Sequence, residues 1–339
     1  MDLSKRKIIA ELGMTHDGSR GQAEAMIAAA AECGVDAVKL QTHISSAETV
    51  RNAPTPPYFK AEPRYEYFER TAFSKDVWKE LKSCAKEHGV EFISSPFSIE
   101  AAELLVEIGV DAIKVPSGEI TNIPYLEYLS GCGLPIIVSS GMSSLEEVDE
   151  CMEIFLKNNC NVALMQCTSE YPCGPEHVGL NMIGEFGKRF PNVPIGFSDH
   201  SSGVWAAIAA FYAGARIIEK HFTLSKKMYG PDAKMSMEPE EMRLLCDSIK
   251  MLEQAMENPV DKGSAEEFSE MKRIFQKSVV AVEEIPAGTV IQKEMLGCKK
   301  PGTGLSTRYL KEIVGLTAKR DLKVDDIIMY EDINWPGAS

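Results

Sequence analysis

CGVDAVKL, residues 33–40, is a glycine turn followed by a short apolar strand, and the alanine-rich segment GQAEAMIAAAAEC leads into it. Almost the same sequence returns as IGVDAIKV at 108–115, and AGARIIEK at 213–220 is a looser copy. In each copy the glycine stands where a helix would end, a position that favours left-handed backbone. The repeat favours a fold built from equivalent helix–strand units, although shared turn chemistry would also explain it.

The alternation of this repeat continues through most of the chain. Short β-branched runs alternate with helix-length segments, and the strands we expect are 8–12, 36–40, 91–95, 111–115, 135–139, 162–166, 194–198 and 216–220. Eight such strands over about 250 residues are typical of a (β/α)8 TIM barrel. An open doubly wound sheet is the alternative, but it usually has fewer strands, and no G-x-G-x-x-G follows the first strand here.

The last part of the chain has a different pattern. Residues 257–273 are polar and charged, and predict a linker that ends in a short helix. Short strands then follow, separated by turns such as PAGT at 286–289, with no long helix. We therefore expect a barrel at 1–256, a linker at 257–275 and a small β-rich domain at 276–339.

Composition excludes several classes of protein. The 339 residues carry a formal net charge of −14, and no basic cluster suited to nucleic acid is present. The apolar run in MDLSKRKIIAELG is too short for a secretion signal or a membrane span. The nine cysteines are scattered without a C-x-x-C pair, which indicates reduced thiols. We expect a cytoplasmic protein that binds neither nucleic acid nor membranes.

Polar side chains gather where the expected strands end. The active site of a (β/α)8 barrel lies at the carboxyl ends of its strands. In this sequence those ends carry Glu11, Lys39, Gln41, Ser95, Lys114, Ser117, Glu119, Ser139, Thr168, Ser169, Tyr171, Ser198, His200, Glu219 and His221. Strand ends that were merely solvated would show a more mixed set, so the sequence predicts a binding site there.

His200 and His221 end two consecutive strands, in GFSDHSSG and IIEKHFT. The ends of neighbouring barrel strands lie side by side, so the two rings can converge on one point. Neutral imidazole is a common ligand for divalent metal ions, which makes a metal site one hypothesis. A hydrogen-bonded histidine of the core or of a turn is the alternative for each ring.

Lys39 and Lys114 occupy equivalent positions of the repeat, inside otherwise apolar strands. A buried lysine needs an anionic partner, which is either a phosphate or carboxylate of a ligand or a glutamate of the barrel. Glu11, at the end of the first strand, could be that partner or could act as a general base.

Two short motifs offer groups for an anion. PSGE at 116–119 follows Lys114 directly; Gly118 lets backbone N–H groups approach a ligand, and the Ser117 hydroxyl can donate to a phosphate. SSGM at 139–142 has the same chemistry. With the lysines, these motifs indicate a phosphorylated or carboxylated ligand.

A set of motifs spread over almost the whole chain resembles one family. IAELGMTHDG, AVKLQTH, SSPFS, IKVPSGE, SSGM, CTSEYPC, GFSDHSSG, IIEKHFT and GPD resemble, in order and spacing, the sialic acid synthases, which include N-acetylneuraminate, legionaminate and pseudaminate synthases. KKPGTGLS is similar to the C-terminal antifreeze-like domain of that family, called SAF, which has a β-clip fold.

The resemblance implies a transferase. The barrel would condense phosphoenolpyruvate with an open-chain N-acetyl-hexosamine, either N-acetylmannosamine or a 2,4-diacetamido-trideoxyhexose. The products would be a nine-carbon 2-keto-3-deoxy acid and phosphate. A divalent ion, Mn²⁺ or Mg²⁺, would lie on His200 and His221 and polarise the sugar aldehyde. Glu11 matches the family glutamate that deprotonates the attacking water.

Further roles follow from the resemblance, residue by residue. The catalytic set would be Glu11, Lys114, Glu119, His200 and His221. Phosphoenolpyruvate would be held by Lys39, Ser95, Lys114, Ser117, Gly118, Ser139 and Ser198. The sugar would be held by Gln41, Glu119, Ser169, Tyr171, Asp232 and Lys300. The resemblance also implies a domain-swapped homodimer, in which the SAF domain of one chain closes the barrel mouth of the other and carries Lys300 to it.

Two positions depart from the family pattern. Ser169 stands where neuraminate synthases more often have asparagine, and Lys300 stands where many members have an arginine, whose planar fork lysine lacks. A legionaminate-type product is therefore a serious alternative. Two other functions also remain open: a metal-independent Schiff-base aldolase with Lys114 as nucleophile, and a non-catalytic sugar-binding or ice-binding protein.

Overall fold

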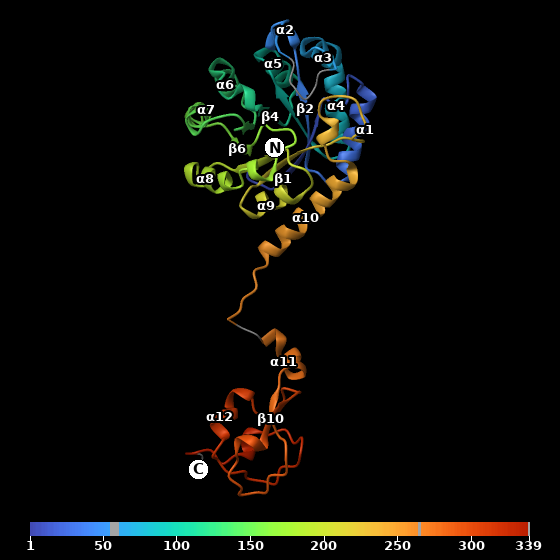
Figure 1. Cartoon of the computed structure of the whole chain (residues 1–339). Helices are drawn as coiled ribbons and strands as arrows, with labels where there is room; N and C mark the ends of the chain where they lie inside the picture. The colour runs from blue at the N-terminus through green and yellow to red at the C-terminus, as the bar shows by residue number, and fades with distance from the viewer. Residues whose placement is uncertain (55–60, 264–265, 338–339) are drawn as a thin grey trace. The chain divides into compact units, whose positions relative to one another are not determined.

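The computed structural model of the protein describes residues 1–54, 61–263 and 266–337. Its contacts divide the chain into two compact units, Met1–Glu257 and Asn258–Ser339 (Figure 1). The linker and second domain expected from the sequence include residues 264–265 and 338–339, which lie outside the described residues. Each unit has a core of its own and is described separately below.

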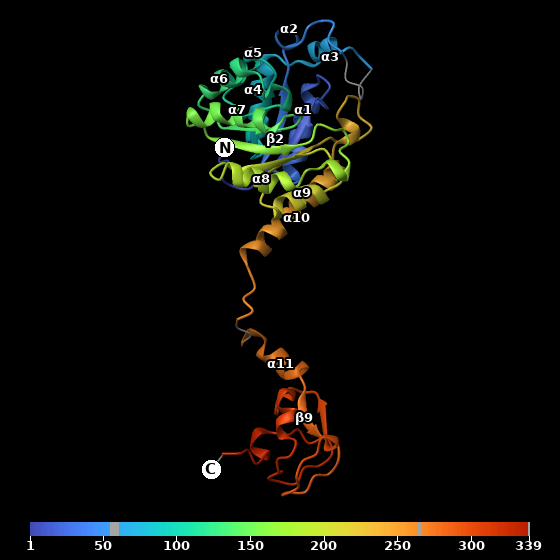
Figure 2. The ribbon, with the colours of Figure 1, turned by 60° about the vertical axis from the view of Figure 1, so that its left-hand side comes forward.

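The first unit is a closed barrel of eight parallel strands in sequential order (Figure 2). The strands are β1 Lys7–Gly13, β2 Ala37–Thr42, β3 Glu91–Pro96, β4 Ala112–Val115, β5 Ile136–Ser139, β6 Val162–Cys167, β7 Ile195–Asp199 and β8 Ile217–His221. Pairing of β8 with β1, with Glu11 opposite His221, closes the ring and leaves no sheet edge. The predicted TIM barrel is confirmed, and the open doubly wound sheet is excluded.

Helices surround the strands of this unit (Figures 1 and 2). They are α1 Arg20–Glu32, α2 Ser45–Glu48, α3 Arg64–Thr71, α4 Lys75–Glu87, α5 Ile99–Ile108, α6 Ile123–Ser130, α7 Leu145–Lys157, α8 Asn181–Arg189, α9 Trp205–Tyr212 and α10 Pro239–Glu257. Serine side chains cap α4, α5 and α7, where they accept hydrogen bonds from backbone N–H groups that the helix leaves unpaired.

The repeated glycine turn has the backbone that the sequence predicts. Gly34, Gly109 and Gly214, one from each copy, have φ angles of +90°, +72° and +114°. A side chain would strain the backbone at these angles, which explains why glycine stands there. Each turn brings the chain from a helix directly into a strand, so the copies are equivalent βα connections.

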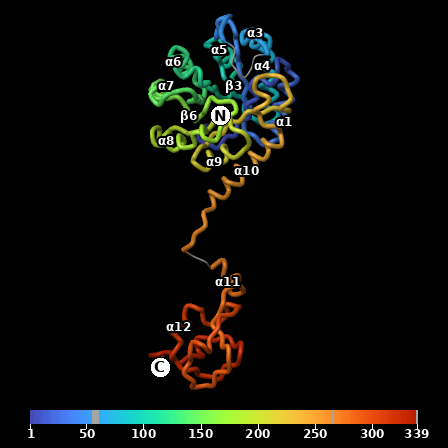
Figure 3. Tube along the Cα trace, in the orientation of Figure 1, coloured from blue at the N-terminus to red at the C-terminus, as the bar shows by residue number. Residues whose placement is uncertain are grey.

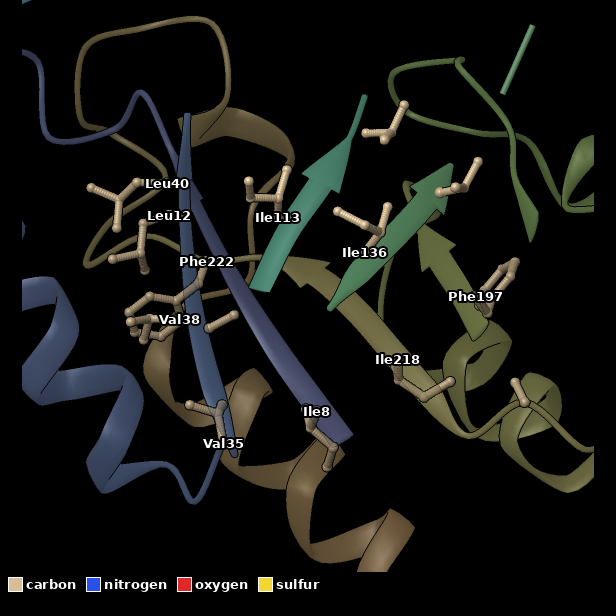
Figure 4. Close-up of a cluster of buried hydrophobic side chains, with 14 of the residues drawn as sticks. Ile8, Leu12, Val35, Val38, Leu40, Ile113, Ile136, Phe197, Ile218 and Phe222 are labelled. Atoms are coloured by element: carbon tan, nitrogen blue, oxygen red, sulfur yellow. The ribbon is translucent and has the colours of Figure 1, made fainter. Parts of the chain in front are cut away.

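The barrel has an apolar layer on each side of its sheet. Outward-facing strand residues such as Ile8, Val38, Ile113, Ile136 and Ile218 pack against the helices in the larger cluster (Figure 4). Inward-facing residues form a second cluster, which consists of Leu3, Ile9, Ala37, Ile93, Ala112, Ile137, Ala163, Met165 and Ile217. The barrel is therefore filled below its carboxyl end and supports the strand ends on a packed core.

The second unit is small and made of short elements (Figure 3). It contains α11 Ser269–Phe275, the antiparallel pair β9 Ser278–Ala281 and β10 Leu296–Lys299, α12 Leu310–Ile313 and several isolated bridges. Its core consists of Val279, Ala281, Ile285, Ile291, Leu305, Ile313, Ala318, Leu322, Ile328 and Ile333. None of the nine cysteines of the chain forms a disulfide. In the part of the chain that the structure describes, no helix is both long and apolar enough to cross a membrane.

Candidate active site

A cavity of about 860 Å³ opens at the carboxyl end of the barrel. Its lining contains fourteen of the residues assigned from the sequence: Glu11, Lys39, Gln41, Ser95, Lys114, Ser117, Gly118, Ser139, Ser169, Tyr171, Ser198, His200, His221 and Asp232. Further lining comes from Met14, His43, Arg64, Phe68, Phe97, Pro116, Met142, Cys167, Glu219 and Pro231. The barrel geometry thus brings together residues that are up to 221 positions apart (Glu11 to Asp232).

Two of the residues assigned from the sequence are not in this lining. Glu119 lies in a 3₁₀ turn, Ser117–Glu119, and its carboxylate accepts a hydrogen bond from Asn122 Nδ2 at 2.7 Å. Lys300 belongs to the second unit, where its ammonium lies 5.1 Å from the ring centroid of Phe275. The turn after β4 therefore brings Ser117 and Gly118 to the cavity, while its third residue contacts the start of α6.

Four buried charges form two ion pairs at the base of the cavity. Lys39 Nζ lies 2.8 Å from Glu11 Oε2, and Lys114 Nζ donates to both carboxylate oxygens of Glu219 at 2.9 Å. Lys39 Nζ is also 3.7 Å from Glu219 Oε1, so the pairs are joined. A buried charge is costly without a partner, and here each one has a partner within the barrel. Of the two possible partners that the sequence left open for the lysines, the described residues show the glutamates of the barrel.

These pairs keep Glu219 and Lys39 ionised. Burial alone would raise the pKa of Glu219, but the Lys114 and Lys39 ammonium groups lower it to about 2. Burial would lower the pKa of Lys39, yet the carboxylates of Glu11 and Glu219 raise it overall. Hydroxyls complete the network, because Lys39 donates to Ser95 Oγ at 3.1 Å and Ser198 Oγ donates to Glu219 at 3.1 Å.

Two glycines next to cavity-lining residues let polar side chains lie close to the backbone. A Cβ atom at Gly141 would overlap with the hydroxyls of Ser117 and Ser169, so the absence of a side chain lets both hydroxyls lie over this turn. At Gly13, where φ is +52°, a Cβ atom would overlap with Asp232, whose carboxylate accepts the N–H of Met14 at 3.1 Å. The sequence signal for both is a glycine at the carboxyl end of a strand: Gly13 ends β1, and Gly141 lies two residues after β5.

The two histidines predicted to bind metal lie side by side, with ring centroids 5.5 Å apart. His200 Nδ1 donates to the carbonyl oxygen of Thr168 at 2.8 Å, which leaves its Nε2 as the acceptor. His221 Nδ1 is buried and has no hydrogen-bond partner among the described residues. The Thr168 carbonyl fixes the ring of His200, and Nδ1 of His221 is left without a partner. Both features fit a site for a divalent ion. Within the same residues, no group of three or more His, Cys, Asp or Glu is arranged to hold a metal. Water or a ligand would have to supply the other coordination positions.

The charge of the rings bears on metal binding. Burial lowers the pKa of His221, which favours the neutral imidazole that ligates metals. Burial also lowers the pKa of His200, but the Cys167 sulfur, 3.9 Å from Nδ1, raises it overall. The same contact lowers the pKa of Cys167 to about 7, against the effect of its burial. A metal ion would therefore compete with a proton at His200.

Behind the histidines lies an ion pair that the sequence did not point to. Lys220 Nζ is 2.8 Å from Asp199 Oδ2 and also donates to the carbonyl oxygen of Ser201, with both charged groups buried. Asp199 precedes His200 and Lys220 precedes His221. The pair ties the ends of β7 and β8 together, and so fixes the spacing of the two histidines.

Sequence reasoning also missed one wall of the cavity, which is formed by the segments that follow β2 and β3. It consists of His43, Phe68 and Phe97, whose rings are stacked, and of Arg64 from α3. His43 and Phe97 lie inside motifs that carry the family resemblance, AVKLQTH and SSPFS, but nothing in their spacing shows that they meet. Glu219 was visible as a strand end and received no role, because its two lysine partners are 105 and 180 residues away.

Comparison with known proteins agrees with this geometry. The model of the NeuB family matches residues 26–261, and the SAF domain model matches residues 276–334. The N,N′-diacetyllegionaminic acid synthase of Campylobacter jejuni is 35% identical over 334 residues, which are 96% of this chain and 99% of that protein. The N-acetylneuraminate-9-phosphate synthase of Mus musculus is 37% identical over 96% of this chain and 92% of its own length.

A solved structure supports the same relation. The N-acetylneuraminic acid synthetase of Leptospira borgpetersenii, determined in complex with citrate, superimposes with a TM-score of 0.69 at 29% identity, covering 79% of this chain and 90% of its own. The resemblance to the sialic acid synthases is therefore confirmed for the barrel and for the C-terminal domain. The chain belongs to the NeuB family of nonulosonic acid synthases and carries a C-terminal SAF domain.

Proposed function

We propose that the protein condenses phosphoenolpyruvate with an open-chain N-acetyl-hexosamine, to give a nine-carbon 2-keto-3-deoxy acid and phosphate. One observation carries the proposal: a single cavity holds two buried lysines ringed by hydroxyls beside two converging histidines. The first group suits the anionic substrate and the second suits a metal-assisted reaction of a carbonyl group. The names of the relatives, which are legionaminic, pseudaminic and neuraminate synthases, support the same reaction class.

The lysine end of the cavity is the proposed site for phosphoenolpyruvate. An ammonium group has three N–H donors, so Lys39 and Lys114 can bind an anion while they keep their glutamate partners. Hydroxyls from four different strand ends would hold the remaining oxygens: Ser95, Ser117, Ser139 and Ser198. Because Glu11 and Glu219 balance the two ammonium charges, the hydroxyls and the backbone N–H of Gly118 are needed to make this end attractive to an anion.

His200 and His221 would hold a divalent ion, with the sugar or water in its other positions. When bound, such an ion is a Lewis acid that polarises the aldehyde of the sugar. The residues of the chain have separate tasks. The Thr168 carbonyl orients His200, and Tyr171, whose ring centroid is 4.1 Å from that of His200, closes this side of the cavity. Gln41, Ser169 and Asp232, which line the same cavity, would orient the sugar.

The proposed reaction forms a C–C bond at C3 of phosphoenolpyruvate and later breaks the C2–O bond to phosphate. C3 of phosphoenolpyruvate attacks the aldehyde carbon, whose oxygen takes up a proton and becomes a hydroxyl. Positive charge develops at C2, and water adds there while Glu11 takes its proton. Phosphate then leaves with cleavage of the C2–O bond, and the C2 hydroxyl becomes the ketone as its proton is lost. Glu11 suits this task because Gln41 Nε2 donates to its Oε1 at 2.8 Å and fixes the orientation of the carboxylate.

The identity of the sugar is the finer part of the proposal. The N-acetyl-hexosamine supplies the last six carbons of the product, so its C6 becomes C9. A synthase of the 9-phosphate, like the mouse relative, would therefore take a 6-phosphorylated sugar. A legionaminate-type enzyme would take a 2,4-diacetamido-trideoxyhexose. The roles of Glu119 and Lys300 at the sugar stay predictions, since neither residue lines the cavity.

A phosphate-release assay tests the reaction and the sugar together. It would compare N-acetylmannosamine, its 6-phosphate, the 2,4-diacetamido-trideoxyhexoses and mannose, each with phosphoenolpyruvate and Mn²⁺ or Mg²⁺. We expect release with one N-acetylated sugar, none with mannose, and loss of release in excess chelator. No release with any of them would refute the proposed reaction.

The aldolase alternative makes a different demand on Lys114. A Schiff-base lysine must be free to attack a carbonyl carbon, whereas Lys114 Nζ donates to both oxygens of the Glu219 carboxylate. Borohydride trapping in the presence of substrate separates the two mechanisms. A stable adduct on Lys114, together with full activity in chelator, would support the aldolase.

We also propose the domain-swapped homodimer that the resemblance implies. The test is complementation: a Glu11→Ala chain is mixed, under conditions of subunit exchange, with a chain truncated after residue 275. In a swapped dimer the intact barrel of the truncated chain receives the partner's SAF domain, so activity should return. Mixed dimers that stay inactive, or an active monomer, would contradict this assembly.

A further inference from the structure

His43 follows β2 and lines the cavity, yet its side chain is only 1% exposed. Its Nδ1 lies 2.9 and 3.0 Å from the two carboxylate oxygens of Glu48, the last residue of α2, whose side chain is 3% exposed. Its Nε2 lies 3.2 Å from Gln41 Oε1. Both ring nitrogens are therefore engaged, by the buried Glu48 carboxylate and by the half-buried Gln41 amide, and the proposed reaction does not yet use either contact.

The partners of Gln41 decide which groups are donors. Gln41 Nε2 donates to Glu11 Oε1 at 2.8 Å, and a carboxylate paired with Lys39 can only accept. The amide oxygen of Gln41 must then face His43, and an amide oxygen is also only an acceptor. Since Glu48 offers the other ring nitrogen two acceptor oxygens, each nitrogen of His43 needs a hydrogen.

We infer that His43 is held as an imidazolium between Glu48 and Gln41, and that it is a positioning residue which locks the Gln41 amide and, through it, the Glu11 carboxylate. The inference deepens the proposed function and rests on it for one point only, the role of Glu11 as the base. The line Glu48–His43–Gln41–Glu11 consists of three side-chain contacts of 2.8–3.2 Å that join buried His43 and Glu11 through the half-buried Gln41.

The surroundings of the ring suit a cation. Phe68 and Phe97 stack on its faces, with centroid distances of 3.6 and 4.2 Å and interplanar angles of 5° and 19°. Aromatic faces carry partial negative charge and attract a cation. A sandwich of two phenyl rings also prevents the imidazole from turning, so its two N–H bonds stay aimed at Glu48 and Gln41.

Other charged or titratable groups nearby leave this assignment unchanged. Lys39 is occupied by Glu11 and Ser95, and the Arg64 guanidinium lies 5.4 Å from the Phe68 centroid. Burial, and then the charge of His43, lower the pKa of His16 to about 3, so this second histidine is neutral. Glu48 is thus the carboxylate that balances the charge of His43 in this part of the site.

Loss of the proton on Nε2 of His43 would break its hydrogen bond to the Gln41 oxygen. A neutral ring that donates to Glu48 through Nδ1 has a lone pair on Nε2, which repels the Gln41 oxygen. The amide would have to turn, and its oxygen would then face the Glu11 carboxylate. Glu48→Gln replaces the carboxylate that faces Nδ1 by a neutral amide, so this variant should show the disruption.

The charge is measured first in the wild-type protein, without any assay of turnover. Long-range ¹H–¹⁵N spectra of ring-labelled histidine distinguish the imidazolium from the two neutral tautomers. The His43 signals are assigned with His43→Gln, or with Phe68→Leu, which removes one stacked ring, if the first variant does not fold. We expect an imidazolium at pH 7.5 in the wild type and a neutral ring in Glu48→Gln. A neutral His43 in the wild type would overturn the inference.

The positioning role has a second readout in the same samples. The side-chain amide signals of Gln41 should shift in Glu48→Gln and stay in place in the control Glu107→Gln, which removes a carboxylate from an exposed ion pair with Lys75. Gln41 signals that do not move in Glu48→Gln would overturn the positioning role. This readout stands even if the protein fails to convert phosphoenolpyruvate with any sugar.

Kinetics provide the test within the proposed function. Loss of one hydrogen bond to a charged group should lower kcat/KM of Glu48→Gln by about 10- to 100-fold at pH 8, with partial recovery toward pH 6. His43→Gln should lose activity at every pH, and Glu107→Gln should keep the wild-type profile. A Glu48→Gln profile parallel to that of the wild type would show a merely structural role.

Discussion

The floor and the mouth of the barrel are built from the same strands, two residues apart. On β1 the inward positions are Ile9 and then Glu11; on β4 they are Ala112 and then Lys114; on β8 they are Ile217 and then Glu219. We call the apolar cluster around Ile9 and Ile217 the floor, and the four charged residues Glu11, Lys39, Lys114 and Glu219 the mouth. On these strands and on β2, a step of one pleat changes the inward side chain from apolar to charged.

This difference separates residues that stabilise the barrel from residues that line its cavity, although both sets lie on the same strands. The floor buries apolar surface, which stabilises the closed ring. In the mouth, removing four charges from water is costly, and their mutual pairing only offsets that cost. Substitutions at the floor should therefore change the free energy of unfolding, whereas substitutions at the mouth should change the chemistry as well.

The largest expected effect comes from the proposed metal site at the rim of the mouth. His221→Ala would remove one of the two proposed protein ligands, so kcat should fall by about 10³-fold or more, because a Lewis acid contributes several kcal/mol to the transition state. Phosphate release and calorimetric titration with Mn²⁺ measure the two consequences. Ile217→Val on the same strand is the control and should keep both. Full activity of His221→Ala in chelator would remove the metal assignment.

Next in size is the loss of one buried charge. Lys114→Ala leaves Glu219 without its bidentate partner, which should cost about 3–5 kcal/mol of unfolding free energy. The variant should also lose binding of phosphoenolpyruvate far more than binding of the sugar, as measured by calorimetry. The double variant Lys114→Ala/Glu219→Ala should regain part of the stability but none of the binding. Normal binding of phosphoenolpyruvate by Lys114→Ala would show that the lysine is structural.

The pH dependence of the free energy of unfolding tests the Lys114–Glu219 pair through its carboxylate. The folded-state pKa of Glu219 is about 2, below its ordinary value of 4.5, so its contribution is complete above pH 4.5 and lost as the pH falls toward 2. The shift corresponds to about 3 kcal/mol. Urea unfolding followed by tryptophan fluorescence in a Trp335→Phe background reports the barrel alone, since Trp78 and Trp205 belong to the first unit. The dependence between pH 4.5 and 2 should be weaker in Glu219→Gln, and an equally steep curve would contradict the pairing.

The smallest effect is expected at the floor. Ile137→Val removes one buried methylene and should lower the free energy of unfolding by about 0.5–1.5 kcal/mol. The kcat and both KM values should stay within twofold of the wild type, because the cavity-lining Ser139 on the same strand keeps its place. A large change in KM would show that floor and mouth are coupled, and would weaken the separation drawn between them.

The sequence by itself determined the architecture and most of the site. The repeated glycine turns and eight apolar runs predicted the barrel, since backbone conformation and strand periodicity are local properties. The rule that ligands meet the carboxyl ends of barrel strands then placed thirteen of the fifteen strand-end residues in the cavity lining. Shared motifs identified the family. A single 3₁₀ turn brings Ser117 and Gly118 into the cavity lining but not Glu119, whose role at the sugar therefore stays a prediction.

Only the tertiary structure decided which of these residues pair. Glu219 meets Lys114 across 105 positions, and Glu11 meets Lys39 through the register of β1 on β2. His43 obtains its charge from Glu48 and Gln41, and its orientation from Phe68 and Phe97, which arrive from two different connections. A pattern of residue types shows where charges can lie. Their partners depend on closure of the barrel and on the way each loop returns over its mouth, and these are properties of the whole fold.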